Sequence, residues 1–414
     1  MEKKKNNDRD LLEESRVGGV IVQLVDTVIK QAALNKASDI HIEPDRDKMR
    51  VRLRVDGILQ EIGSHSISLL PSLVSRIKIL ANLDISEHRL PQDGRFQMTV
   101  DNREFDLRVS TFPTISGENV VMRILDKSQI ILGLEELGMN PSDLEKFNSF
   151  IHRLYGLVLV TGPNGSGKTT TLYSALNIIN SPDKSIATLE DPIEYQLPLV
   201  RQTQVDLEAK LTFAEGLRSL LRQDPDVIMV GEIRDRDTAG ISVQAALTGH
   251  LVLSTLHTND AVGALTRLVD MGIEPVLLSA ATIGVIAQRL VRKICPNCTE
   301  KYQVSPEIAK KMTLADTTTL YRGRGCGQCN DTGYRGRTGI YEVLSIDDEI
   351  RTLLVAKAPF EQILDAARKH GMQSLHDDGI EKALAGITTI EEVIRVTEAR
   401  RLVEQDTEKA VPAV

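Results

Sequence analysis

The stretch from Leu157 to Thr170, Leu-Val-Leu-Val-Thr-Gly-Pro-Asn-Gly-Ser-Gly-Lys-Thr-Thr, constrains the fold of this chain more than any other. A short apolar run is typical of a buried strand, and the glycines after it allow backbone geometries and close approaches that side chains would block. A helix-compatible segment follows, so backbone N–H groups and the positive end of a helix dipole face one point. The sequence therefore predicts a phosphate-binding loop between a strand and a helix.

The full G-x-x-x-x-G-K-T pattern assigns roles to residues of this loop. We expect Lys168 to contact the β- and γ-phosphates of a nucleotide and the Thr169 hydroxyl to ligate Mg²⁺. The predicted nucleotide-binding residues are Gly162, Pro163, Asn164, Gly165, Ser166, Gly167, Lys168, Thr169 and Thr170. A glycine-rich turn without a ligand is the alternative, but the strand–loop–helix context favours a nucleotide site.

Apolar segments and helix-like segments alternate from the loop onward. The strand candidates are residues 157–161, 185–189, 227–230 and 251–255, and the helix candidates lie near 168–180, 213–223, 236–248 and 260–271. Such alternation predicts an α/β core whose parallel sheet is covered by helices on both faces. In these sheets the chemistry gathers beyond the carboxyl ends of the strands.

Two of the predicted strands end in carboxylates. Glu190 closes the second strand, and Glu232 follows the third. Phosphoryl transfer needs one group that holds Mg²⁺, directly or through water, and one that orients or deprotonates the attacking water. Glu190 and Glu232 are the candidates, and the sequence leaves open which has which role. Either carboxylate could instead cap a helix or pair with Arg234.

The fourth predicted strand ends close to His257. Its place at a strand tip, near the position of the phosphates, suggests that this histidine senses the γ-phosphate. A lone histidine is more often a hydrogen-bonded structural residue, and that is the alternative for His257.

All four cysteines fall in two C-x-x-C pairs, Cys295 with Cys298 and Cys326 with Cys329. Each pair can present two thiolates to one tetrahedral ion, so the sequence predicts a structural Zn²⁺ site in a module over residues 291–345. The long gap between the pairs costs little closure entropy. Two disulfides are the alternative, which a reducing compartment disfavours. A redox-active pair is also disfavoured, because the two pairs together account for every cysteine.

Two further domains flank the core in the prediction. After a polar lead-in over 1–16, helical spacing over 21–32, alternation in 39–43, 49–57 and 103–109, and a helix-like stretch over 69–83 predict an α+β, PAS-like arm over 17–128. The core covers 129–290. Helical patterns, with a capping box at Thr388–Glu391, predict a helical C-terminal subdomain over 346–400, and a disordered tail over 401–414 follows.

Charge and composition exclude several classes of protein. Acidic residues outnumber basic ones by 58 to 50, and aromatic residues make up 3% of the chain. Neither a basic surface nor a stacking platform for nucleic acid is therefore expected. The charged N-terminus lacks the apolar core of a signal peptide, and no stretch approaches the length of a membrane-spanning helix. We expect a cytoplasmic protein that binds no nucleic acid and inserts no segment into a membrane.

Taken together, these motifs resemble those of the type II secretion and type IV pilus assembly ATPases, the GspE/PilB family. The segments that carry the resemblance are Ala37–Pro44, Arg89–Arg95, the phosphate loop, Leu189–Glu194, Val230–Asp235, Leu253–Asn259 and Cys326–Tyr334. The resemblance implies a RecA-like core and a hexameric motor that hydrolyses ATP to drive assembly of a pseudopilus or a pilus. It also implies inner-membrane platform and docking proteins as partners. Retraction ATPases generally lack the tetracysteine module, so its presence favours secretion or assembly.

The sequence thus predicts an ATPase that uses ATP, Mg²⁺ and Zn²⁺. Its predicted catalytic residues are Lys168, Glu190, Glu232, Arg234 and His257, with Arg234 and His257 reporting the γ-phosphate. The rival functions are a motor that translocates nucleic acid and a nucleotide-gated scaffold that holds partners without turnover.

The arm contains three arginines in predicted turn or strand positions, Arg89, Arg95 and Arg108, although it has no phosphate loop of its own. Our hypothesis is that the arm lends arginine to the γ-phosphate of a bound nucleotide, as arginine fingers do in cis or in trans. Solvated side chains, or ion pairs within the arm with Asp93, Asp101 or Glu104, are the alternative.

Overall fold

The computed structural model describes residues 19–126, 132–304, 315 and 318–397 of the 414-residue chain. The predicted lead-in over 1–16 and tail over 401–414 lie outside these residues. The chain divides into two compact units, Met1–Ile130 and Ile131–Val414, called here the first and second units. Within the described ranges, no helix has both the length and the apolar character needed to cross a membrane.

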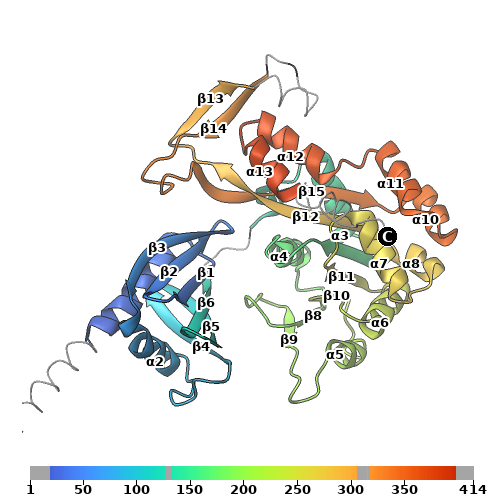
Figure 1. Cartoon of the computed structure of the whole chain (residues 1–414). Helices are drawn as coiled ribbons and strands as arrows, with labels where there is room; N and C mark the ends of the chain where they lie inside the picture. Colours follow the sequence, from blue (N-terminus) through green and yellow to red (C-terminus); the bar gives the residue numbers. More distant parts are fainter. Residues whose placement is uncertain (1–18, 127–131, 305–314, 316–317, 398–414) are drawn as a thin grey trace, which may run out of the picture. The chain divides into compact units, whose positions relative to one another are not determined.

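The first unit contains a six-stranded antiparallel sheet in the order β3-β2-β1-β6-β5-β4 (Figure 1). Its strands are β1 Asp39–Pro44, β2 Lys48–Val55, β3 Ile58–Ser66, β4 Gln92–Val100, β5 Arg103–Thr114 and β6 Gly117–Asp126. A helix over 19–34, the short η1 (Ile67–Leu69) and α2 (Leu70–Leu80) accompany the sheet. Alternate strand residues such as Val51 and Leu107 form one buried core with apolar residues of the two longer helices. The other face carries the polar residues of each alternating strand.

The second unit is built on a seven-stranded sheet in the order β15-β12-β7-β11-β10-β8-β9. Its strands are β7 Gly156–Thr161, β8 Ile186–Glu190, β9 Arg201–Gln204, β10 Val227–Val230, β11 Leu251–Leu256, β12 Thr282–Ile294 and β15 Tyr334–Ser345. All neighbouring pairs are parallel except β12 and β15. Every residue of β7, β10 and β11 is buried, as expected for strands covered on both faces.

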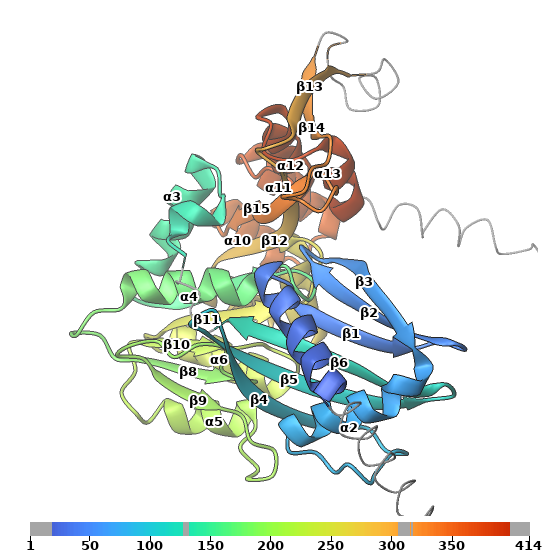
Figure 2. The same ribbon diagram turned by 90° about the vertical axis from the view of Figure 1, so that its left-hand side faces the viewer.

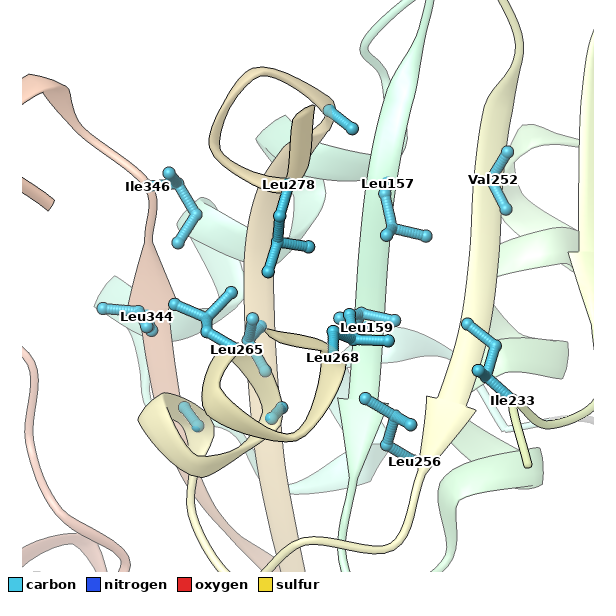
Figure 3. Packing of buried hydrophobic residues seen from close by; sticks show 14 of the residues in the cluster. Leu157, Leu159, Ile233, Val252, Leu256, Leu265, Leu268, Leu278, Leu344 and Ile346 are labelled. Atoms are coloured by element: carbon cyan, nitrogen blue, oxygen red, sulfur yellow. The ribbon is translucent and has the colours of Figure 1, made fainter. Parts of the chain in front are cut away.

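Helices cover both faces of this sheet. They are η2 Leu134–Leu137, α3 Pro141–Ile151, α4 Lys168–Ile179, α5 Phe213–Leu220, α6 Arg236–Leu247, α7 Ala261–Asp270 and α8 Pro275–Ala281. Leu157 and Leu159 of β7 pack in one apolar core with residues of α5 to α8, and Figure 3 shows them near Leu265, Leu268 and Leu278. The intervening residues of β7 pack in a second core with α3 and α4. The predicted α/β arrangement of these strands and helices is confirmed.

The antiparallel edge strand β15 was not expected in a parallel sheet. It falls within the predicted zinc module over 291–345, yet it pairs with β12 along nearly its whole length. The chain between these strands holds no helix among its described residues, only the two-stranded sheet of β13 (Thr299–Gln303) and β14 (Thr319–Gly323). A return without a crossover helix gives antiparallel pairing.

Four short helices end the described chain: α10 Asp348–Val355, α11 Phe360–Lys369, α12 Leu375–Leu384 and α13 Ile390–Thr397. Figures 1 and 2 show β13 and β14 beyond the edge of the core sheet, near α12 and α13. The capping hydroxyl of α13 belongs to Thr389, which accepts a hydrogen bond from the Glu392 N–H at 3.2 Å. The predicted capping box at Thr388–Glu391 was thus one residue too early.

Candidate active site

The phosphate loop, residues 162–167, connects β7 to α4. Its three glycines have positive φ, at 150° for Gly162, 74° for Gly165 and 89° for Gly167. A Cβ on Gly162 would lie 2.3 Å from the Gln288 carbonyl oxygen, and one on Gly167 would lie 2.8 Å from the Gln288 side-chain nitrogen. Glycine is therefore required by the backbone conformation at all three positions, and also by the close approach of β12 at two of them.

Lys168 is the first residue of α4 and is mostly buried. Its Nζ donates hydrogen bonds to the carbonyl oxygens of Gly162 at 2.8 Å and Pro163 at 3.2 Å. Burial lowers the pKa of Lys168, and the charge of Glu232 acts in the opposite direction. The ammonium group is thus held against the loop and within electrostatic reach of Glu232.

The loop has features that fit the phosphates of a nucleotide. Ser166 is 4% exposed, and its Oγ has no hydrogen-bond partner among the residues that the structure describes. A buried hydroxyl of this kind is costly unless a ligand completes its hydrogen bonding. Thr169 and Thr170 at the start of α4 are exposed, so the Thr169 hydroxyl is accessible to a metal ion. The loop therefore combines backbone donors, a lysine and free hydroxyls at one helix N-terminus.

Three predicted residues meet at the tips of β10 and β11. Glu232 accepts a hydrogen bond from an Arg234 terminal nitrogen at 2.5 Å through one oxygen, and its other oxygen lies 3.2 Å from His257 Nε2. Arg234 also lies 3.5 Å from a carboxylate oxygen of Asp191. Burial raises the pKa of Glu232, but Arg234 and His257 outweigh it and lower the pKa overall. The site thus holds an ionised carboxylate between two positively charged or polar groups.

The position of His257 follows from contacts between neighbouring strand ends. Thr161 ends β7, and its hydroxyl accepts a hydrogen bond from the Thr258 N–H at 2.8 Å. The two threonine hydroxyls lie 2.7 Å apart. These bonds fix the residue after His257 to the strand that leads into the phosphate loop, so the histidine lies on the loop side of the sheet.

Glu190 has different surroundings. It ends β8, is 3% exposed, and accepts hydrogen bonds from Tyr173 at 2.5 Å, Thr188 at 2.6 Å and Gln202 at 3.0 Å. Burial and the Glu190 carboxylate together raise the pKa of the Tyr173 hydroxyl, which therefore stays a donor. None of these three donors belongs to the group around Glu232. The structure therefore brings Glu232, Arg234 and His257 together and leaves Glu190 in a separate buried network.

The arm arginines lie in the first unit. Arg95 and Arg108 are opposite each other on β4 and β5, and Arg123 of β6 is opposite Arg108 on the other side. Arg89 lies between α2 and β4, with its side chain 90% exposed and 3.8 Å from Glu87. Of the acidic partners suggested by the sequence, Asp101 instead lies 3.7 Å from Lys30.

The four cysteines form one cluster. The Sγ atoms of Cys295 and Cys326 are 3.9 Å apart, those of Cys298 and Cys329 are 3.9 Å apart, and those of Cys326 and Cys329 are 3.7 Å apart. A tetrahedral Zn²⁺ with Zn–S bonds of about 2.3 Å places its sulfurs roughly 3.8 Å from one another. All four cysteines are free thiols. The donor set and its geometry therefore fit zinc, and the disulfide alternative is not what the structure contains.

Backbone amides support this cluster. The N–H groups of Cys326 and Gly333 donate to Cys329 Sγ at 3.2 and 3.3 Å. Burial raises the pKa of Cys329, but these amides, together with hydrogen bonds from the thiols of Cys326 and Cys298, outweigh it and lower the pKa to about 7. Thiolate character of this kind is what a metal ligand needs.

Reasoning from the sequence missed Gln288 on β12, Tyr173 on α4 and Asp191 after β8 as parts of the site. Of these three, only Gln288 could have been suspected from the sequence, because it is a glutamine next to the apolar residues Val-Ile-Ala. Tyr173 and Asp191 acquire their roles only through partners that are distant in sequence.

The chain is similar to known secretion and pilus proteins over most of its length. A family model described as "Type II/IV secretion system protein" matches residues 14–395. The chain is 52% identical over 392 residues to the type II secretion system protein E of Dickeya dadantii, covering 94% of this chain and 78% of that relative. It is 49% identical over 379 residues to the type IV pilus assembly ATPase PilB of Thermus thermophilus, covering 91% of this chain and 43% of the relative.

Among solved structures, the chain is similar to the pilus retraction motor PilT with bound ADP. The TM-score is 0.60 at 27% identity, and the match covers 91% of this chain and 98% of that one. The resemblance inferred from the motifs is confirmed. The chain therefore belongs to the type II/IV secretion system protein family and is a secretion ATPase.

Proposed function

We propose that this protein hydrolyses ATP at the phosphate loop and uses that energy to drive assembly of a pseudopilus in a type II secretion machine. The observation that carries the proposal is the carboxylate of Glu232, held between Arg234 and His257 at the strand tips within electrostatic reach of Lys168. Extension of a type IV pilus is a second candidate, supported by the identity with a pilus assembly ATPase.

Each residue has a defined task in the proposed reaction. Lys168 exchanges its two loop carbonyls for phosphate oxygens, and Ser166 and the loop N–H groups bind the same phosphates. Water attacks the γ-phosphorus, the bond to the ADP oxygen breaks, and Glu232 accepts the proton of the water. Because Arg234 and His257 contact Glu232, both are in a position to respond to the presence of the γ-phosphate.

Thr169 is the residue that would hold Mg²⁺ in this proposal. When bound, the ion neutralises charge on the phosphate oxygens. Glu190 is the second carboxylate at a strand tip and would orient the water shell of the metal, for which its buried hydrogen bonds must rearrange. The four cysteines would hold one structural Zn²⁺, whose coordination positions they fill.

The assembly and its surroundings belong to the same proposal. The active form is a hexamer in the cytoplasm that binds the inner membrane only through platform and docking proteins, without inserting into the bilayer and without nucleic acid. Arg89, Arg95 and Arg108 of the PAS-like arm contribute positive charge to the γ-phosphate in that ring. The acidic net charge of −8 is consistent with protein partners.

The substitution Lys168→Ala tests the proposed site. It removes the positive charge directed at the phosphates, so ATP binding and turnover should be lost while fold and zinc content persist. Lys369→Ala is the matched control, because Lys369 is an exposed lysine on α11 whose nearest carboxylate is Glu349 at 3.7 Å. Turnover by Lys168→Ala at the rate of the control variant would refute the assignment.

A further inference from the structure

We propose that Gln288 is a positioning residue that holds the phosphate loop in its nucleotide-binding shape. The inference rests on the proposed nucleotide site and adds to it a strand, β12, that no sequence motif assigns to nucleotide binding. Gln288 would order the loop before a nucleotide binds. Its loss should therefore change the affinity for nucleotide more than the rate of the chemical step.

The Gln288 carboxamide joins the loop to the helix that follows it. Gln288 is 2% exposed, and its Nε2 donates a hydrogen bond to the Ser166 carbonyl oxygen at 2.8 Å. Its Oε1 accepts a hydrogen bond from the Thr171 hydroxyl at 2.7 Å, in the first turn of α4. Thr171 is itself fully buried. One side chain therefore bridges a loop carbonyl and a buried helix hydroxyl, and the same hydroxyl also interacts with Tyr341.

The register of the sheet explains why β12 supplies this residue. β12 runs parallel to β7, with Ile286 opposite Val160 and Ala287 opposite Thr161. Gln288 is the next residue of β12, so it lies where the chain leaves β7 and enters the loop. The close approach that excludes a Cβ at Gly162 and Gly167 is made by the backbone and side chain of this same residue.

The expected consequence is a loss of preorganisation. A loop whose N–H groups already face one point binds an anion without first losing conformational entropy. Without the Gln288 bonds, nucleotide binding must order the loop, so affinity falls. The contacts of Gln288 are with Ser166 and Thr171 and not with Glu232, Arg234 or His257, so KM should change far more than kcat.

The experiment compares Gln288→Met, Thr171→Val and the double variant in the full-length protein. Mg·ADP affinity is measured by calorimetry, and KM and kcat by steady-state ATP hydrolysis. Thr171→Val loses one buried hydrogen bond and should weaken Mg·ADP binding by about tenfold, whereas Gln288→Met loses two and should weaken it at least as much. The double variant should bind little more weakly than Gln288→Met, because that substitution alone already removes both hydrogen bonds. Thr171→Ser should retain affinity, since it keeps the hydroxyl.

Controls separate positioning from general stability. Ser242→Ala removes a buried hydroxyl whose hydrogen bond to the Thr238 carbonyl lies within α6, and it should leave Mg·ADP affinity unchanged. Wild-type Mg·ADP affinity in Gln288→Met, or two single effects that multiply in the double variant, would overturn the inference. If Gln288→Met does not fold, Thr171→Val against Thr171→Ser gives the same test.

Lys168→Ala distinguishes this inference from the function on which it rests. If Lys168→Ala binds Mg·ADP normally, the nucleotide site is wrong and the inference falls with it. If Lys168→Ala loses Mg·ADP while Gln288→Met and Thr171→Val keep it, the nucleotide site stands and only the role of Gln288 is refuted.

Discussion

Two carboxylates in the second unit have pKa shifts of opposite sign. Glu232 is surrounded by Arg234 and His257, which lower its pKa against the effect of burial. Glu342 of β15 is 4% exposed, and burial raises its pKa to about 7 although it accepts a hydrogen bond from the Ala261 N–H at 2.7 Å. Glu232 is therefore kept ionised by its positively charged neighbours and can accept a proton, whereas burial favours the protonated form of Glu342.

The Glu342 shift predicts a pH-dependent stability. Below pH of about 4.5, Glu342 is neutral in both the folded and the unfolded chain; between there and pH 7 only the unfolded chain loses the proton, so stability falls as pH rises. Glu342→Gln should therefore stabilise the second unit more at pH 8 than at pH 5, and the gain in unfolding free energy should differ between the two pH values by up to about 3 kcal/mol. Thermal unfolding at both pH values measures this difference. An equal difference at the two pH values would contradict the buried, protonated state.

At the scale of elements, β12 connects the two ends of the second unit. Gln288 in its middle bonds the phosphate loop, and the strand runs on to Ile294 and then Cys295 of the metal cluster. Near that end, Arg292 donates to Glu392 of α13 at 2.8 Å, and Arg395 and Arg292 together lower the pKa of Glu392 to about 2 against the effect of its burial. The metal cluster is thus anchored to the core sheet and to a C-terminal helix.

Zinc is predicted at one ion per chain. Because four thiolates leave no open position, the ion has a structural role and its loss should unfold the β13–β14 segment without disrupting the core sheet. Cys298→Ser should lower zinc content in elemental analysis and increase proteolysis between 295 and 333. Serine in place of a thiolate keeps the size of the side chain, so unchanged zinc content would argue against the four-cysteine site.

The periodicity of the sequence predicted the elements that are buried on both faces or alternate cleanly. Strands β7, β8, β10 and β11 are apolar runs between helical patterns, and such runs have few alternatives in a parallel sheet. β9 was missed because Arg201–Gln204 is a polar edge strand without periodic burial. β15 was placed in the wrong module because its partner, β12, is determined by tertiary pairing and by no local signal.

The sequence predicted those residues of the candidate site that belong to a recognisable motif. The loop, Lys168, Glu232 and the cysteines follow from spacing and from strand ends. The network around Glu190 does not, because Tyr173 and Gln202 come from other elements and meet it only in the folded sheet. The same holds for Gln288, whose partners precede it by more than a hundred residues.

At the scale of the whole molecule, the arm should make hydrolysis depend on neighbouring subunits. Arg95, Arg108 and Arg123 are side by side on three strands, and Arg123 also lies 3.4 Å from Asp39 of β1. We expect specific activity to rise with protein concentration or enforced hexamerisation, and Arg→Ala at 89, 95 or 108 to lower turnover far more than ATP affinity. A monomer that hydrolyses ATP at the full hexamer rate, with all three substitutions silent, would contradict this expectation.

The proposed role of Glu232 is tested by single-turnover hydrolysis of ATP in assembled protein that carries Glu232→Gln. The amide keeps the shape of the side chain but cannot accept a proton, so the variant should bind ATP with nearly wild-type affinity and release ADP and phosphate at least about a hundredfold more slowly. Glu215→Gln, on the exposed surface of α5, should hydrolyse as the wild type does. Hydrolysis at the wild-type rate by Glu232→Gln, or equal loss of ATP binding, would contradict the account of Glu232 as the group that activates water.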